Sequence, residues 1–265
     1  MASHDEATAT LALLSKTFIH GSHILHHHGV VDAYGHLSFR HPSRPDIFLM
    51  SYNVAPADIT SPKDLIAYRV EDAEPDQKTE AKGYAERMIH SEIYRRHPYI
   101  QAVVHSHAES VVPYTISSVP LKPCYHMSAF IAADGAPVYD IADHYRDDDL
   151  PDMLVSKRHL GAALAELFDG ASVLALMRGH GFTVVAESME LAVLRAVYTQ
   201  KNAAIQTTAL QLARDGLQTG GASGIKYLSP RECEAANGRN IWSHKRPWEL
   251  WVHEVEAEPL YTNLA

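Results

Sequence analysis

Three histidines are the residues of this 265-residue sequence whose spacing best suits chemistry at a metal ion. His105 and His107 form a His-x-His pair at the end of the apolar run IQAVVH. If this run is a strand, the spacing places both imidazoles on one face, with Cα atoms about 6–7 Å apart. His180 follows a second apolar run and lies between two glycines, where missing side chains let the ring approach a cation closely. The set predicts a catalytic rather than a structural metal site, because coordination positions stay open for a substrate.

The His-x-His pair alone is a weak signal, because the chain contains 18 histidines and a lone histidine is usually a hydrogen-bonded core or surface residue. The residues around these histidines favour a metal site over ordinary core or surface histidines. Glu86 and His90 stand four positions apart in AERMIHSEIYRRHP, the His-x-His run follows, and RGHG completes the set around His180. The N-terminal part ends in HHHGVVDAYGHLSFRHP.

These motifs, in this order, resemble the class II aldolase and adducin family over most of residues 8 to 215. The resemblance implies an α/β protein with a three-layer α/β/α fold around a central mixed, largely antiparallel sheet. It also implies one divalent metal ion per chain on His105, His107 and His180. Glu86 then matches the catalytic acid/base, and a labile fourth ligand is the alternative. Three imidazoles suit Zn, Mn, Fe and Co alike, so the identity of the metal stays open.

The chain departs from the sugar-phosphate aldolases of that family where those enzymes hold phosphate. Their Gly-Asn-x-Ser turn is Gly35-His36-Leu37-Ser38 here, and their Ser-Ser pair before the glutamate is Tyr84-Ala85. Imidazole, phenol and apolar groups thus replace amides and hydroxyls that would cradle a phosphate. We therefore expect a flat, partly apolar and non-phosphorylated substrate.

The altered segments GH.S.RHP, ER.IH.EIY, AVVHSH and LMRGHG resemble the aromatic-acid decarboxylase branch of the family, which includes hydroxypyridine-dicarboxylate and dihydroxyphthalate decarboxylases. The resemblance implies a carbon–carbon lyase that decarboxylates a hydroxylated aromatic acid. Aldol cleavage and this reaction both leave an electron pair that must be delocalised onto a neighbouring oxygen, which a metal ion stabilises. Retro-aldol cleavage of a non-phosphorylated hydroxy-ketone and iron-dependent oxygenation of a hydroxyaryl acid stay open. A non-catalytic adducin-like scaffold is disfavoured, since a scaffold has no reason to keep the ligand set.

Six further residues are candidates to bind the substrate: Arg178, His36, Ser38, Arg40, Tyr125 and His126. Arg178 precedes the Gly-His-Gly turn and Arg40 follows the altered turn, so each could bind a carboxylate in a bidentate manner; a surface ion pair is the alternative. Ser38 could bind an anion or only cap a turn. Tyr125 and His126 are candidates for the pocket wall.

Composition narrows the function further. A formal net charge of −9 and a pI near 6.0 argue against nucleic-acid binding. Cys124 and Cys233 are too few for a disulfide framework, and MASHDEATAT lacks a signal-peptide pattern. No run approaches the roughly 18–20 apolar residues of a membrane helix. We therefore expect a soluble cytoplasmic enzyme that acts on a small molecule, with no nucleic-acid or membrane partner.

Hydrophobic periodicity predicts the elements that carry these residues. Helices are expected at 6–28, 83–97, 154–168 and 189–215, and strands at 36–40, 46–51, 65–70, 100–105 and 172–177. Residues 119–145 are expected to be loop-rich with two short strands. We expect a single domain over 1–265, with a core at about 8–215 and a C-terminal cap or intersubunit arm at 216–265. The family resemblance and the tail tryptophans Trp242, Trp248 and Trp251 predict a homo-oligomer, a tetramer.

Overall fold

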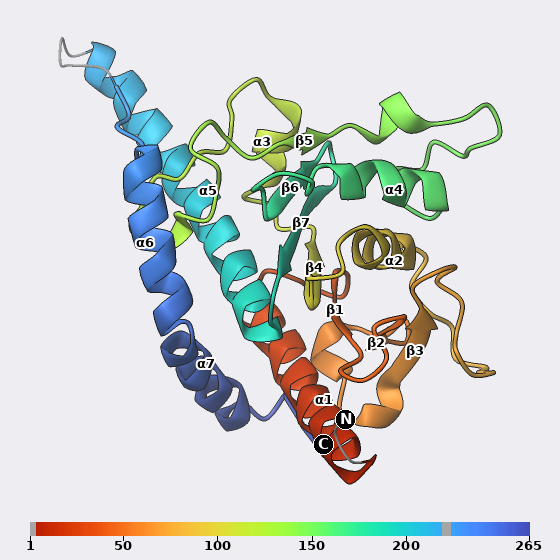
Figure 1. Ribbon diagram of the computed structural model, residues 1–265. Helices are drawn as coiled ribbons and strands as arrows, with labels where there is room; N and C mark the ends of the chain where they lie inside the picture. Colours follow the sequence, from red (N-terminus) through yellow and green to blue (C-terminus); the bar gives the residue numbers. More distant parts are fainter. Residues whose placement is uncertain (1–3, 219–223) are drawn as a thin grey trace.

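A seven-stranded sheet forms the centre of the protein, in a computed structural model that describes residues 4–218 and 224–265 (Figure 1). The strands are β1 (His36–Arg40), β2 (Ile47–Ser51), β3 (Leu65–Arg69), β4 (Ala102–Ser106), β5 (Val138–Tyr139), β6 (Leu174–Met177) and β7 (Gly181–Ala186). Their order is β3-β2-β1-β4-β7-β6-β5, and only β5 and β6 pair in parallel. The predicted mixed, largely antiparallel sheet is confirmed.

Helices cover both faces of this sheet. They are α1 (His4–His27), α2 (Arg87–Arg96), α3 (Val112–Ile116), α4 (Arg158–Glu166), α5 (Met189–Gln218), α6 (Pro230–Ser243) and α7 (Lys245–Ala257), with 3-10 helices at Pro56–Asp58, Pro62–Asp64, His126–Ser128 and Ile141–His144. The long helices α1 and α5 pack together and against the sheet, while α2 and α4 pack together in the other hydrophobic cluster (Figure 1). The three-layer α/β/α fold is thus confirmed. No helix within the described residues is both long and apolar enough to span a membrane.

Strand β4 shows which layer of the fold His105 faces. Val104 lies in the cluster with α1 and α5, whereas Val103 lies in the cluster with α2 and α4. Successive side chains of a strand alternate between faces, and a central strand is apolar on both. His105, two residues after Val103, therefore lies on the α2 side of the sheet.

The C-terminal segment completes the larger core. Helix α7 packs against α1 and α5, and Trp251 is buried there. Beyond α7, the hydroxyl of Tyr261 lies 2.9 Å from Nδ1 of His26. In contrast, Trp242 on α6 is 74% exposed. Part of the segment is therefore integral to the fold, and part presents an apolar surface.

Several predicted elements differ from the observed ones. Helix α2 begins at Arg87, so Glu86 precedes the helix and does not lie on it, and α4 begins at Arg158 because Lys157 before it is extended. Of the two short strands expected in 119–145, only β5 forms. Strand β7 was not predicted. Its run FTVVA is rich in β-branched residues, which is the signal that could have identified it.

Candidate metal centre

The predicted ligand side chains converge at one point on the sheet. The Nε2 atom of His105 lies 3.0 Å from that of His107 and 3.2 Å from that of His180, and the latter two atoms are 2.9 Å apart. Oε2 of Glu86 lies 3.6 Å from Nε2 of His180 and 3.7 Å from Nε2 of His105. The four ligand atoms thus all lie within 4.8 Å of one another.

Hydrogen bonding among the rings cannot explain this geometry. Each Nε2 of a neutral imidazole is either a donor or an acceptor, so among three mutually close atoms two must have the same role and repel. A cation between them removes this conflict. Ligand atoms about 2.0–2.1 Å from a tetrahedral Zn²⁺ are themselves roughly 3.3 Å apart, close to the observed spacing. The residues therefore fit a divalent metal ion.

The electrostatics also suit metal binding. Burial, followed by the neighbouring imidazoles of His180 and His36, holds the pKa of His105 well below its usual value. Burial and His180 also lower the pKa of His107. Both rings are consequently neutral at pH 7 and have a lone pair to offer, as metal coordination requires.

Two contacts outside the ligand set orient it. Nδ1 of His105 lies 3.2 Å from Oγ1 of Thr183 on the paired strand β7. A proton on Nδ1 donated to this hydroxyl leaves Nε2 free as a ligand. The backbone amide of Val155 donates to Oε1 of Glu86 at 3.0 Å and leaves Oε2 to face the histidines. Sequence reasoning missed both. The amide contact carries no side-chain signal, whereas Thr183 could be found only through the strand register.

The chain reversal between β6 and β7 brings His180 to the cluster. Gly179 has φ +64, a left-handed conformation that favours glycine. At Gly181 the backbones nearly touch, since an added Cβ would lie 2.0 Å from the carbonyl oxygen of Ser106 and 3.0 Å from Cα of His107. The backbone thus requires glycine at 181 and favours it at 179.

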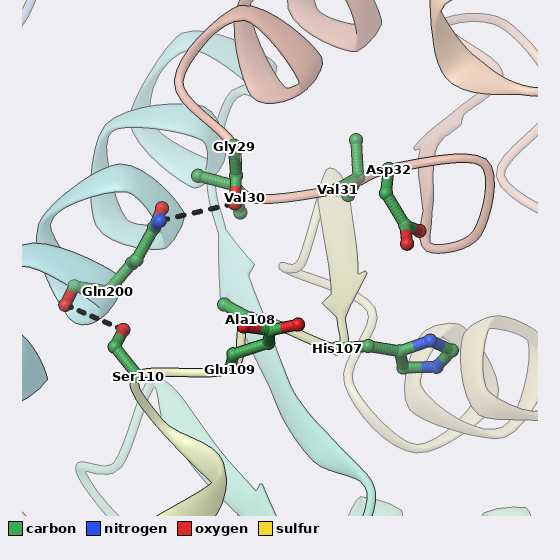
Figure 2. A pocket seen from close by; sticks show the side chains of 9 residues that line it. All are labelled: Gly29, Val30, Val31, Asp32, His107, Ala108, Glu109, Ser110 and Gln200. Carbon is green, nitrogen blue, oxygen red and sulfur yellow. Dashed lines mark hydrogen bonds between the residues drawn. The ribbon is translucent and has the colours of Figure 1, made fainter.

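Two cavities meet at His107. One, of about 370 Å³, is shown in Figure 2 and is lined by Gly29, Val30, Val31, Asp32, His107, Ala108, Glu109, Ser110 and Gln200. The other, of about 220 Å³, is lined by Tyr34, Gly35, His36, Asn53, Tyr84, Ala85, Glu86, His107 and Leu154. The carboxylates of Asp32 and Glu109 make the first unfavourable for an anionic ligand. The second, which we call the aromatic cavity, combines two phenol rings, two imidazoles and Glu86.

The predicted substrate-binding residues are placed differently from one another. His36 lines the aromatic cavity, with its ring centroid 5.1 Å from that of His105. Nε of Arg178 lies 2.6 Å from Oδ1 of Asp140 and holds the pKa of that carboxyl below its usual value. The Arg178 side chain also lines a small cleft beside His180. Arg178 is thus in an ion pair at the margin of the site.

Arg40 and Ser38 do not face the aromatic cavity. The guanidinium of Arg40 donates to the backbone carbonyls of Ile100, Pro45, Tyr94 and His97, which leaves too few N–H groups for a bidentate carboxylate contact. The prediction for Arg40 is therefore corrected, because this buried side chain anchors backbone. Ser38 is fully buried, and its hydroxyl contacts His90 and Tyr94.

Tyr125 and His126 lie away from the ligand cluster of their own chain. Tyr125 packs against Tyr198 of α5, with ring centroids 6.1 Å apart, and His126 is exposed at the 3-10 helix that contacts α6. Neither residue lines the two cavities that meet at His107. The structure thus gives them no place in the wall of the aromatic cavity.

Comparison with known proteins agrees with this architecture. Residues 16–207 match the model of the class II aldolase and adducin N-terminal domain. The chain belongs to the class II aldolase and adducin family. A fold neighbour is the L-fuculose 1-phosphate aldolase of Glaciozyma antarctica, with a TM-score of 0.71 at 17% identity, covering 99% of this chain and 97% of that one.

Relatives place this family member in the decarboxylase branch. It is 48% identical over 258 residues to decarboxylase tropJ of Talaromyces stipitatus, covering 94% of this chain and 97% of the relative. It is 30% identical over 231 residues to a 3,4-dihydroxyphthalate decarboxylase of Rhodococcus jostii, covering 83% of this chain and 85% of the relative. The predicted resemblance to decarboxylases is confirmed at the level of the family branch.

Proposed function

We propose that the protein is a metal-dependent carboxy-lyase that removes CO₂ from a hydroxylated, non-phosphorylated aromatic carboxylic acid. The observation that carries this proposal is the Glu86, His105, His107 and His180 cluster at the edge of the aromatic cavity. Tyr34 and Tyr84 supply flat apolar surfaces for a ring. The names of the relatives support the reaction, and one of them names a dihydroxylated aromatic diacid as its substrate.

The proposed cofactor is one divalent ion per chain, with Zn, Mn, Fe and Co as candidates. His105, His107 and His180 would hold it through Nε2, and Glu86 would be either the acid/base or a fourth ligand. When bound, such an ion supplies Lewis-acid stabilisation of negative charge on an oxygen of the substrate.

Glu86 is the group best placed to transfer the proton. Loss of CO₂ breaks the bond between the ring and the carboxyl carbon, and the electron pair left on the ring must take up a proton. The Glu86 carboxyl lines the aromatic cavity, and the amide of Val155 fixes one of its oxygens. Its other oxygen, Oε2, faces the histidines at the edge of the cavity, where a general acid beside the bound ring would be needed.

The aromatic cavity is poorly suited to a phosphate group. No lysine or arginine is found among its lining residues in the described part of the chain. Tyr84, at a position where sugar-phosphate aldolases have serine, donates its hydroxyl hydrogen to the Val54 carbonyl and is not free to bind phosphate. A phosphate group would thus find neither a lysine or arginine nor the Tyr84 hydroxyl available among these lining residues.

A substrate screen tests this proposal. We expect metal-loaded protein to release CO₂ from at least one aromatic acid with an ortho hydroxyl, without consuming O₂, and to leave L-fuculose 1-phosphate unchanged. Turnover of the sugar phosphate without any CO₂ release would instead indicate an aldolase. CO₂ release that requires O₂ would indicate an oxygenase. Measuring CO₂, O₂ and the sugar phosphate on the same preparation separates these outcomes.

We also propose a cytoplasmic homotetramer in which residues 1–265 form one domain and 216–265 act as a cap or intersubunit arm. The apolar side chains of Leu212, Trp242 and Leu250 are 67%, 74% and 55% exposed, which leaves surface for a second copy. The two cysteines are free, as is usual for a reducing compartment.

Light scattering tests the tetramer. Four chains of 29.4 kDa correspond to about 118 kDa, the mass expected at micromolar concentration. Substitution of the exposed Trp242 by serine is expected to lower this mass if the surface is an interface. A fully active particle of 29.4 kDa would refute the assembly.

A further inference from the structure

A chain of buried hydrogen bonds runs from the aromatic cavity into the core. Nδ1 of His36 lies 2.7 Å from Nε2 of His90, and Nδ1 of His90 lies 2.6 Å from the Ser38 hydroxyl. This hydroxyl lies 2.8 Å from that of Tyr94. All four side chains are buried, and only His36 lines the cavity. This series of hydrogen bonds connects residues of β1 with residues of α2, next to the candidate metal centre.

The direction of these hydrogen bonds follows from Tyr94, the residue farthest from the cavity. Tyr94 keeps its proton, because burial raises the pKa of its hydroxyl. Among the described residues, the only hydrogen-bond acceptor found for it is Ser38. Since a buried donor without an acceptor is strongly unfavourable, Tyr94 donates to Ser38, and Ser38 must then direct its own proton to Nδ1 of His90.

The same reasoning determines which nitrogen carries the proton in each of the two imidazoles. Burial lowers the pKa of His90 to about 3, so the ring is neutral and carries one proton. With Nδ1 accepting from Ser38, that proton lies on Nε2 and is donated to Nδ1 of His36. Because Nδ1 of His36 accepts this hydrogen bond, the proton of the His36 ring lies on Nε2, the nitrogen not bonded to His90.

This series of hydrogen bonds orients His36 and does not conduct protons. It ends at Tyr94, which is 1% exposed and has the guanidinium of Arg40 over its ring at 4.7 Å. Arg40 is in turn fixed by backbone carbonyls on both sides of α2's end. Tyr94 is buried, and within the described residues its hydroxyl has no acceptor other than Ser38 to which a proton could pass. The effect of the hydrogen-bonded series is therefore to fix which atom of each side chain donates a proton.

We propose that His90, Ser38 and Tyr94 are positioning residues that hold His36 with its proton on Nε2, so that His36 presents a neutral N–H donor to an anionic oxygen, carboxylate or phenolate, of the ligand in the aromatic cavity. The nature of that ligand rests on the proposed function, whereas the tautomer of His36 does not. Ser38 thereby acts through His90 and His36 and does not touch the substrate.

The tautomer can be measured directly in the intact protein. Nitrogen-15 NMR of histidine-labelled protein distinguishes an imidazole protonated on Nε2 from one protonated on Nδ1, and the His36 signals are identified by their loss in His36→Gln. We expect Nε2–H for both His36 and His90, with and without added Zn²⁺. A proton on Nδ1 of His36 overturns the proposal, whatever reaction the protein catalyses.

Two substitutions at one position test whether the orientation matters. Glutamine at 90 places an amide near the Nε2 position and can still donate to His36, whereas asparagine reaches only the Nδ1 position next to Ser38. In His90→Gln we expect His36 to keep its proton on Nε2. We expect kcat/KM of this variant to stay within about threefold of the unsubstituted protein. For His90→Asn we expect a loss of about tenfold or more, the loss typical of a hydrogen bond to a charged group.

A control separates positioning from packing. Tyr68 is 1% exposed in the same hydrophobic cluster as Tyr94, and its hydroxyl is buried without a partner, so Tyr68→Phe should change neither the His36 signals nor kcat/KM. Urea unfolding is measured for all variants. Equal losses of activity in His90→Gln and His90→Asn that follow their stability would assign His90 a packing role only and refute the positioning role. If the NMR result holds but no CO₂ is released by any variant, the proposed function fails while the tautomer assignment stands.

Discussion

Replacement of both His105 and His107 by alanine is expected to remove the metal almost completely. These residues supply two of the three Nε2 atoms that converge at 2.9 to 3.2 Å, and His180 with Glu86 is too small a set to retain a divalent ion through desalting. We expect less than about a tenth of an equivalent of metal and CO₂ release at background. Elemental analysis after purification without added metal measures the first quantity, and a CO₂ assay the second.

The matched control is a double substitution of His27 and His253, two exposed histidines on α1 and α7. It removes the same number of imidazoles and should leave about one equivalent of metal per chain. Full occupancy in the His105→Ala, His107→Ala variant would show that the ion binds elsewhere. Circular dichroism of both double variants verifies that the sheet still forms.

A second large effect is expected for Glu86→Gln. Glutamine can keep the hydrogen bond from the Val155 amide through its own oxygen, so the loop between Asp149 and Val155 is not disturbed. What is lost is a carboxyl group that can transfer a proton at the edge of the aromatic cavity. General acid/base groups contribute about 10²- to 10⁴-fold, so kcat should fall by roughly that factor while KM changes little.

Glu92→Gln is the corresponding control, because Glu92 is also a buried carboxylate at α2 but pairs with Arg95 and Arg158. Its kcat should be near normal. Metal content is measured in both variants. A fall in occupancy with Glu86→Gln would identify Glu86 as a ligand, and a variant with full metal and normal kcat would exclude it as the source of the proton.

The convergence of the three histidines could be predicted from sequence because its signals are local. The His-x-His spacing predicted two rings on one side of a strand, and the rings do converge although β4 ends at Ser106, one residue before His107. The glycines around His180 indicated an unusual backbone there. The observed Nε2 geometry agrees with that reasoning. The strands at His36–Arg40, Ile47–Ser51 and Leu65–Arg69 were likewise found, since short apolar runs between turn residues are a strong signal.

Long-range partners could not be predicted in this way. His36 and His90 are 54 positions apart, and only the packing of α2 under β1 brings their rings together. Arg40 looked like a carboxylate-binding residue by its place after the altered turn, but its surroundings are the backbone carbonyls at the end of α2. The helix start also escaped prediction, since Tyr84, Ala85 and Glu86 are compatible with a helix yet remain outside α2. In each case tertiary contacts overrode the local pattern.

The near contact between Gly181 and Ser106 means that position 181 cannot accept other residues, whereas the walls of the aromatic cavity can. Any side chain at Gly181 would have to displace the carbonyl of Ser106, and with it the neighbouring ligands His105 and His107. The walls of the aromatic cavity, such as Tyr34 and Leu154, have no such restriction. In a mutagenised library, changes of substrate range should therefore accumulate in the cavity walls, while position 181 remains glycine in every active clone.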